Sequence, residues 1–322
     1  MDDAERLYVS DDPETFKAHA QLFQAALPAD GTVARILFDH VNGTAIVGPG
    51  VPMRLIAAIV NTNDTAGTID VLGAKAGPNA NGMAAGHTAT KQFLQAHEID
   101  QNVESHAVAA GGNVPLGDFV LQAGAAGKTG DCATGIFDVQ CHAGNARYEV
   151  RVMACDPSSG LDKFGSVPKV DSDGKFRRGV FDISGTATVQ TIEFGGAPVT
   201  IGPQHQFYPH VSGDTYPGPG HTGEYGVLKR FRCDMTGPQQ ARLAQSARGA
   251  GNATATYLID DELVESHQFS PNPFLRVKSF DVPDVGAPVN VVTMAEINST
   301  LPIQCAIGPD APPIADAPIV QV

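Results

Sequence analysis

Short runs of alternating apolar and polar residues, separated by turns rich in Gly, Asn, Asp and Pro, recur along this chain. In the first part of the chain they cover 32–38, 53–60 and 68–72. A second set covers 226–233 and 255–259. Alternation with a period of two is typical of strands that bury one face. The pattern therefore predicts a mainly β protein with two tandem antiparallel β-sandwich domains.

One segment departs from this pattern. Apolar positions between 82 and 97 recur at helical spacing in an Ala-rich stretch, which predicts one short helix. The stretch 16–27 fits a helix or a strand by its periodicity, and we favour a strand because Pro13 and Pro28 flank it.

The strand over 53–60 is the most apolar of the set. Ile56 alternates there with Leu55 and Ala57, and its neighbours favour an inward face. We therefore expect Ile56 in the main core.

Turn residues mark the domain boundaries. We expect an N-terminal β-sandwich domain over 1–155 and a linker over 156–176, where turn residues dominate and little can be buried. A C-terminal β-sandwich domain follows over 177–308. The Pro-rich residues 309–322 are expected to form an extended tail.

Composition narrows the range of partners. The chain has 322 residues, with 42% hydrophobic and 17% charged residues, and its net charge is −14. A field of that sign repels phosphates, so we expect no nucleic-acid partner. No apolar run is long enough for a transmembrane helix, so we expect no transmembrane segment.

Several short phrases, in order along the chain, resemble a family of exported bacterial proteins of unknown function with paired immunoglobulin-like β-sandwiches. The phrases are Tyr8-Val-Ser-Asp-Asp-Pro-Glu14, Leu37-Phe-Asp-His-Val-Asn-Gly-Thr44, Gly77-Pro78, Gly86-His87, Gly135-Ile-Phe-Asp138, Arg178-Gly-Val-Phe181, Gly223-Glu-Tyr-Gly-Val-Leu228, Thr256-Tyr-Leu-Ile-Asp260, Leu263-Val-Glu265 and Val291-Val-Thr-Met-Ala-Glu296. The resemblance spans most of residues 5–307. It implies immunoglobulin-like domains and an exported location, and it supplies no reaction, ligand or catalytic residue.

The first residues bear on that location. Met1-Asp-Asp-Ala-Glu5 is acidic, whereas a signal peptide begins with basic and then apolar residues. We therefore expect an extracytoplasmic protein, secreted or on the cell surface, whose signal peptide is not present in this chain.

A long Gly- and Pro-rich loop over 202–223 holds the densest group of candidate ligands. Its ring side chains are candidates for contacts with a partner, because each buries a ring and keeps a polar tip. These are His205, Tyr208, His210, Tyr216 and His221. Three imidazoles with Glu224 also suit Zn²⁺ or Cu²⁺, so His205, His210, His221 and Glu224 form the candidate metal site. The alternative is a set of exposed loop histidines without a metal.

Two further groups deserve testing against the structure. His40, which ends a strong strand, and His87, within the expected helix, are candidates to line a small polar pocket; the alternative is that both are structural.

Cys132 and Cys141 are close in sequence and are a candidate disulfide if they lie on neighbouring strands. The alternative is that they are small buried apolar residues.

No motif here specifies a catalytic residue, and we expect no enzyme activity and no cofactor. Asp171-Ser-Asp-Gly174 is similar to a fragment of a calcium loop but lacks the later ligands, so we interpret it as a hairpin turn.

We expect a structural or binding protein with a protein or cell-surface partner, including self-assembly. The alternatives are a metal-binding protein or metal-dependent enzyme using the His-rich loop, and a subunit of a surface filament or layer.

Overall fold

The computed structural model describes residues 1–28, 30–142, 147–173, 177–186, 189–193, 199–201, 208–212, 225–234, 240–247, 253–269, 275–281, 288–296 and 303–309. The chain divides into two compact units. Unit 1 comprises Met1–Ser184 and Tyr208–His221, and unit 2 comprises Gly185–Phe207 and Thr222–Val322. The protein is mainly β, as predicted.

The described residues of unit 1 form two sheets and several helical segments. Its strands are β1 (Arg6–Ser10), β2 (Thr15–Phe16), β3 (Ala20–Leu27), β4 (Asp30–Asn42), β5 (Met53–Asn61), β6 (Gly67–Asn79), β7 (Glu104–Val108), β8 (Asn113–Leu121), β9 (Cys132–His142), β10 (Tyr148–Cys155), β11 (Arg178–Asp182) and β14 (His210–Ser212). Its helices are α1 (Thr44–Val47), α2 (Gly82–Leu94), a π-helical turn η1 (Gln95–Asp100) and a 3₁₀ helix η2 (Leu161–Ser166).

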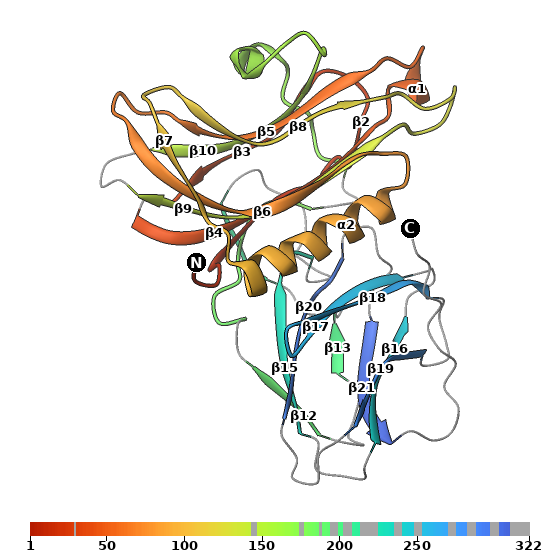
Figure 1. Cartoon of the computed structure of the whole chain (residues 1–322). Helices are drawn as coiled ribbons and strands as arrows, with labels where there is room; N and C mark the ends of the chain where they lie inside the picture. The colour runs from red at the N-terminus through yellow and green to blue at the C-terminus, as the bar shows by residue number, and fades with distance from the viewer. Residues whose placement is uncertain are drawn as a thin grey trace. The chain divides into compact units, whose positions relative to one another are not determined.

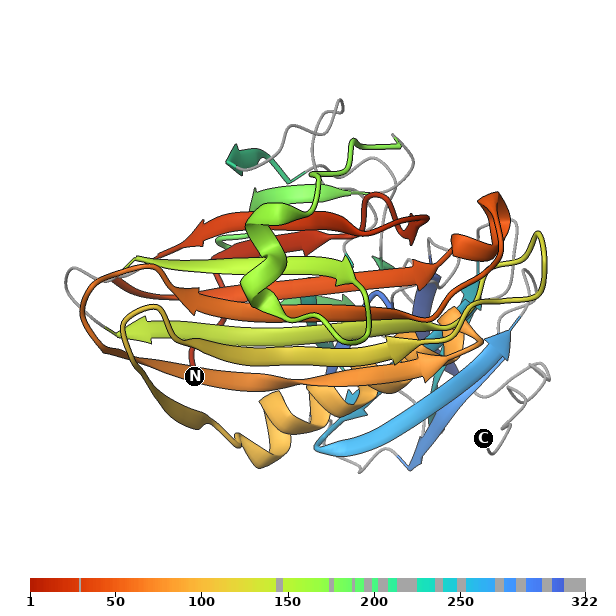
Figure 2. The ribbon, with the colours of Figure 1, turned by 90° about the horizontal axis from the view of Figure 1, so that it is seen from above.

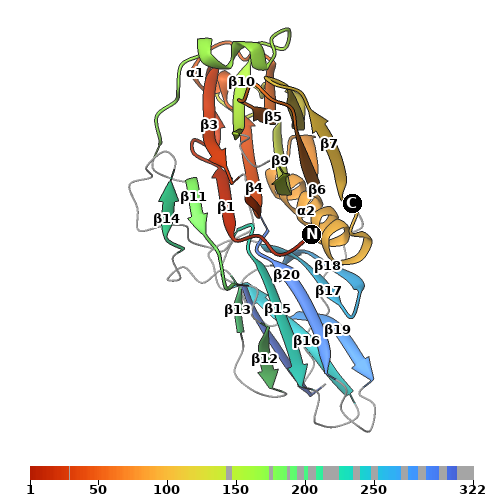
Figure 3. The same ribbon diagram turned by 90° about the vertical axis from the view of Figure 1, so that its left-hand side faces the viewer.

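The first sheet, sheet A, has the order β14-β11-β1-β4-β9-β6-β7, with β2 paired to β4. The second, sheet B, has the order β3-β10-β5-β8. Figure 3 shows β1, β11 and β14 side by side at one edge of sheet A. Most pairs are antiparallel, but β1 and β2 both run parallel to β4, so the expectation of purely antiparallel sheets is wrong for unit 1.

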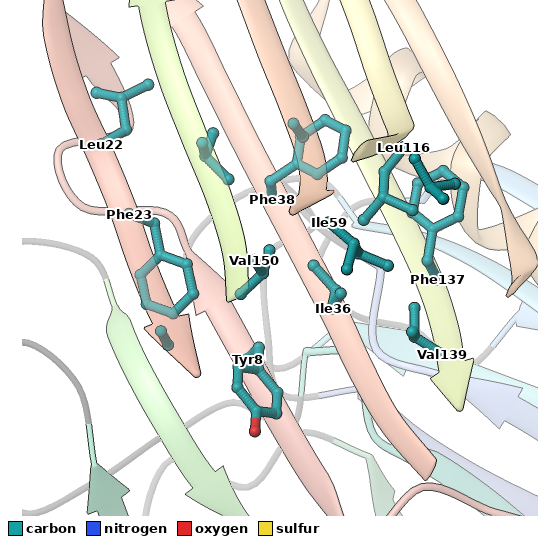
Figure 4. Packing of buried hydrophobic residues seen from close by; sticks show 14 of the residues in the cluster. Tyr8, Leu22, Phe23, Ile36, Phe38, Ile59, Leu116, Phe137, Val139 and Val150 are labelled. Atoms are coloured by element: carbon teal, nitrogen blue, oxygen red, sulfur yellow. The ribbon is translucent and has the colours of Figure 1, made fainter. Parts of the chain in front are cut away.

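The core of unit 1 lies between these sheets. Alternate residues of β4, including Ile36 and Phe38, meet residues of sheet B such as Ile59 and Val150 (Figure 4). Phe38 and Phe137 stack with their ring centroids 6.3 Å apart. Burial of this apolar surface on both sheets is the main source of stability for such an arrangement.

The other face of sheet A is covered by α2 (Figure 1). This element confirms the helix predicted over 82–97. Asn81 caps its first turn, because its side chain accepts hydrogen bonds from the amides of Met83 and Ala84. A second covered face explains why residues 33–42 are buried without alternation.

The segment predicted as a linker, 156–176, instead packs on unit 1 as far as it is described. Helix η2 lies over the outer face of sheet B (Figure 2), where Phe164 is buried beside Ile56 and Met153. The side chain of Gln21 donates hydrogen bonds to the carbonyls of Phe164 and Val167 at 2.6 and 2.8 Å. The division between units therefore falls after Ser184 rather than within 156–176.

The same cover corrects the register expected for β5. Leu55, Ala57 and Ile59 face the main core, whereas Ile56 faces outward. Ile56 stays buried only because η2 covers it. The predicted inward face of Ile56 was wrong by one residue.

Unit 2 also contains two described sheets. Its strands are β12 (Gln190–Glu193), β13 (Val199–Ile201), β15 (Leu228–Asp234), β16 (Gln240–Ala247), β17 (Ala253–Ile259), β18 (Glu262–Phe269), β19 (Leu275–Asp281), β20 (Val289–Met294) and β21 (Ile303–Pro309). The orders are β12-β15-β20-β17-β18 and β13-β21-β16-β19. The Tyr257 hydroxyl donates to Gln245 at 2.7 Å, which joins β17 of one sheet to β16 of the other. The expected tail lies outside the described residues beyond Pro309.

Candidate functional site

The His-rich loop is described only in part. His205, Tyr216, His221 and Glu224 lie outside the described residues, so neither the predicted metal set nor the full binding loop can be assembled. Tyr208 is buried. His210 begins β14 and packs edge-on against Phe181, with ring centroids 5.6 Å apart. Within the described residues, Tyr208 and His210 thus contribute to the packing of unit 1.

His40 is wholly buried on β4 and both of its ring nitrogens are engaged. Nε2 lies 2.8 Å from the Ser10 hydroxyl, and Nδ1 lies 3.1 Å from the Pro13 carbonyl oxygen. Burial lowers the pKa of His40 to about 4, so the ring is neutral at pH 7.

The Ser10–His40 pair has the distance expected of a nucleophile and its base. However, Ser10 is 1% exposed and His40 is 0% exposed, so a substrate cannot reach either in this conformation. The sequence did not reveal this pair, because 30 residues separate its members. His87 is also buried, on α2. The polar pocket predicted for His40 and His87 stays a prediction, since the described contacts of His40 are to Ser10 and Pro13.

The predicted disulfide is wrong. Cys132 and Cys141 lie at opposite ends of the same strand, β9, and both are free thiols. Nine steps along an extended strand separate them by roughly 30 Å, far beyond the reach of a disulfide. Both are buried, and burial raises the pKa of each thiol to about 12. They act as small apolar residues.

A short loop at one end of unit 1 exposes apolar side chains. We call residues 43–52 the tip loop; it contains α1 and no charged residue. Val47 is 63% exposed, Val51 46% and Ile46 41%. Single exposed aliphatic residues are ordinary, but here three belong to one short uncharged loop.

Buried polar groups hold the tip loop in place. Asn42 is fully buried, and its side-chain amide donates to the carbonyls of Val51 and Leu121, both at 2.9 Å. Its carbonyl oxygen accepts the Thr44 amide and hydroxyl at 3.0 and 2.8 Å. At Gly43 a side chain would collide with Thr15, so the close approach requires glycine. The tip loop is therefore rigid rather than adaptable.

Three carboxylates meet where the loop between β1 and β2 approaches β4. A carboxylate oxygen from each of Asp11, Glu14 and Asp39 lies within 4.8 Å of one from each of the others. We call these residues the carboxylate cluster. Asp11 and Glu14 belong to the loop between β1 and β2, and Asp39 belongs to β4. Thr134, opposite Asp39 in β9, donates a hydrogen bond to the Asp39 carboxylate.

Asp11 is the least satisfied member of the cluster. Its Oδ1 is buried and has no hydrogen-bond partner. Burial, together with the negative charges of Asp39 and Glu14, raises the pKa of Asp11 well above its ordinary value. The neighbouring Asp12 is engaged elsewhere, since its carboxylate accepts hydrogen bonds from Ser172 and from the Asp173 amide.

A second buried polar group lies under α2. Arg35 on β4 and Asp138 on β9 are directly paired, and two hydrogen bonds of 2.7 Å join them. The guanidinium also lies 4.8 Å from the centre of the Phe93 ring. His97 of η1 contacts Glu98 through Nδ1 at 2.7 Å, and its Nε2 lies 3.1 Å from Asp138 without a well-aligned hydrogen bond.

A cavity of about 400 Å³ opens beside the β2–β3 turn. Its wall combines the cationic side chains Lys17, His19 and Lys169 with Asp171 and Asp173. The balance of charges favours no single class of ligand.

No protein-family model matches the chain, and no curated protein matches it. One solved structure with a low similarity is described as the cryo-EM atomic structure of Broad Bean Stain Virus. The identity is 10%, with 96% of this chain and 90% of that chain covered, and the TM-score is 0.19. A score that low carries no argument about fold or function. Among the described residues, no helix has both the length and the apolar character needed to cross a bilayer.

Proposed function

We propose that this protein is a non-enzymatic, extracytoplasmic structural protein that self-associates through its tip loop. We also propose that its two units are tandem β-sandwiches of the immunoglobulin-like kind. The two face-to-face sheets of unit 1 and the hydrogen bond between the sheets of unit 2 support that architecture. The observation that carries the function is the rigid, uncharged tip loop with exposed Val47, Val51 and Ile46.

Charge favours a second copy of this chain as the partner. Each chain carries a net charge of −14, so two copies repel one another over most of their surfaces. The repulsion is weakest where both surfaces are uncharged, as at the tip loop. An anionic membrane is a poorer partner, because the tip loop has no Lys or Arg to attract it.

Covering the exposed parts of these side chains favours assembly. Fully burying a Val or Ile side chain is worth about 1.5–3 kcal/mol relative to full exposure, and each of the three, at 41–63% exposed, has about half of that to gain. Preorganisation by Asn42 and Thr44 reduces the entropy that binding would otherwise lose.

Sedimentation velocity over a wide range of protein concentration tests the proposal. We expect the wild type to sediment faster as concentration rises, and Val47→Asp/Val51→Asp to stay monomeric. Added salt should strengthen the wild-type association, because it screens the repulsion between copies.

Val120→Asp is the matched control. Val120 is 42% exposed, and its neighbours on β8 and β5 are Asp118 and Arg54. This change should leave association intact, and thermal unfolding should confirm that all variants are folded. A wild type that is monomeric at every concentration would refute the proposal. The proposal would also be refuted if Val120→Asp abolished self-association to the same extent as Val47→Asp/Val51→Asp.

A further inference from the structure

The carboxylate cluster is assembled by the backbone of unit 1. The Val41 amide donates to the Glu14 carbonyl at 2.8 Å, which fixes the loop after β1 against β4. The Asp11 amide donates to the Arg177 carbonyl at 3.0 Å. The register of β4 and β9 places Thr134 beside Asp39. These contacts hold the three side chains near one another before any ligand arrives.

The charges around Asp11 are one-sided. The described charges that act on Asp11 are those of Asp39, Glu14, Asp12 and Asp173, and all are negative. A buried carboxylate oxygen without a donor costs free energy that a cation or a proton can recover. A proton would satisfy Asp11 alone, whereas a divalent cation would contact one carboxylate oxygen from each of the three residues.

We propose that Asp11, Glu14 and Asp39 bind a calcium ion. The donor atoms are carboxylate oxygens, which are the ligands that hard cations prefer over softer metals. Ca²⁺ tolerates irregular geometry and completes its shell with water, whereas Mg²⁺ demands near-octahedral ligands. His40, the nearest residue with ring nitrogens along β4, is engaged by Ser10 and Pro13 and offers no nitrogen ligand.

Binding of this ion would join the loop between β1 and β2 to the middle of sheet A. The three ligands come from positions 11, 14 and 39, so the ion cross-links segments that are distant in sequence. A ligand that binds only the folded state stabilises it in proportion to its saturation. The protein is therefore expected to be more stable in calcium than in a chelator.

Isothermal titration calorimetry of EDTA-treated, dialysed full-length protein with CaCl₂ tests the site. We expect one saturable binding event and a rise in melting temperature with calcium. The titration should extend to about 10 mM, above the dissociation constants of weak extracellular calcium sites. Asp11→Asn and Asp39→Asn should each weaken binding at least tenfold.

Asp2→Asn is the control, because Asp2 is exposed and the change removes the same charge from the chain. It should bind calcium as the wild type does. If Asp39→Asn does not fold, the comparison rests on Asp11→Asn, whose folding is checked by circular dichroism in EDTA. The proposal is overturned if calcium produces neither heat nor a melting shift, if Asp11→Asn retains wild-type affinity, or if MgCl₂ binds more tightly than CaCl₂. Calcium binding can be measured whether or not the protein self-associates. A failure of this proposal is therefore distinguishable from a failure of the proposed self-association.

Discussion

Asp138 is a buried carboxylate of unit 1 and Asp11 has a buried Oδ1, yet the pKa values of the two groups move in opposite directions. Burial alone would raise both. At Asp138 the attraction of Arg35 and the contact with His97 outweigh burial, and the pKa falls below its ordinary value. At Asp11 the neighbours are other carboxylates, which add to the effect of burial and raise the pKa. The sign of the neighbouring charge, rather than depth, therefore decides the protonation state.

The two environments indicate different roles. Asp138 and Arg35 satisfy one another within unit 1 through two hydrogen bonds, as a structural ion pair must when it is buried. Asp11 retains a buried oxygen with no partner. A buried polar group that lacks a hydrogen-bond partner within the protein is the better candidate for a ligand contact. Three experiments test this distinction.

The largest effect is expected from Arg35→Met. The variant leaves the Asp138 carboxylate buried without its guanidinium, and breaking a buried pair in this way costs about 3–5 kcal/mol. Urea unfolding at neutral pH measures the loss. Arg35→Met/Asp138→Leu should recover most of it, because neither charge remains. A single-variant loss below about 1 kcal/mol, the value typical of exposed pairs, would show that the pair is not buried in solution.

Asp11→Asn should change how stability depends on pH. In EDTA, the raised pKa means that the folded protein holds the Asp11 proton more tightly than the unfolded chain does. This contribution is complete below the ordinary value of 3.8 and is lost as the pH rises through the folded-state pKa. As the pH rises above 3.8, the free energy of unfolding of the wild type should therefore fall relative to that of the variant. The difference should reach about 1.4 kcal/mol for each unit by which the folded-state pKa of Asp11 exceeds the unfolded-state value.

Asp138 provides the opposite reference for the same measurement. Its lowered pKa gives a contribution that is present above 3.8 and is lost as the pH falls through the folded-state value. Urea unfolding from about pH 2 to about pH 8 follows both groups, because the Asp138 contribution changes below 3.8 and the Asp11 contribution changes above it. Parallel curves for the wild type and Asp11→Asn would contradict the difference between the two carboxylates.

The smallest effect is expected from His97→Gln, at about 1 kcal/mol. Burial lowers the pKa of His97, but contacts with Asp138 and Glu98 outweigh burial and raise it above 6.5. Its contribution is therefore complete below 6.5 and is lost as the pH rises through the folded-state pKa. Thermal unfolding in acidic and alkaline buffers should show the variant losing stability mainly in acid. An equal loss in both buffers would assign His97 to packing alone.

Much of the local structure was predictable because it depends on neighbours in sequence. Alternation located the strands β5, β6 and β17, and helical spacing located α2. The tip loop begins at Gly43, directly after the end of β4. The hydrogen bonds that make this loop rigid depend on Leu121 and Val51, which the sequence could not place beside Asn42.

The candidate sites depended on contacts between distant segments. Residues 11 and 39 meet because β1 runs parallel to β4, a pairing that no local pattern reveals. The same pairing brings Ser10 to His40. One usable signal was present, since both carboxylate-bearing phrases, Tyr8–Glu14 and Leu37–Thr44, were singled out in the sequence.

The sequence by itself determined which segments of this protein form strands and where α2 lies, because side-chain periodicity acts within a few residues. Only the tertiary structure decided what covers each face. Helix η2 buries Ile56 on the outer side of sheet B, and β9 keeps Cys132 and Cys141 apart on one strand. It also decided that Asp138 meets a guanidinium while Asp11 meets other carboxylates. Charge and burial act through space, so the chemistry of a side chain is set by neighbours that the order of residues does not show.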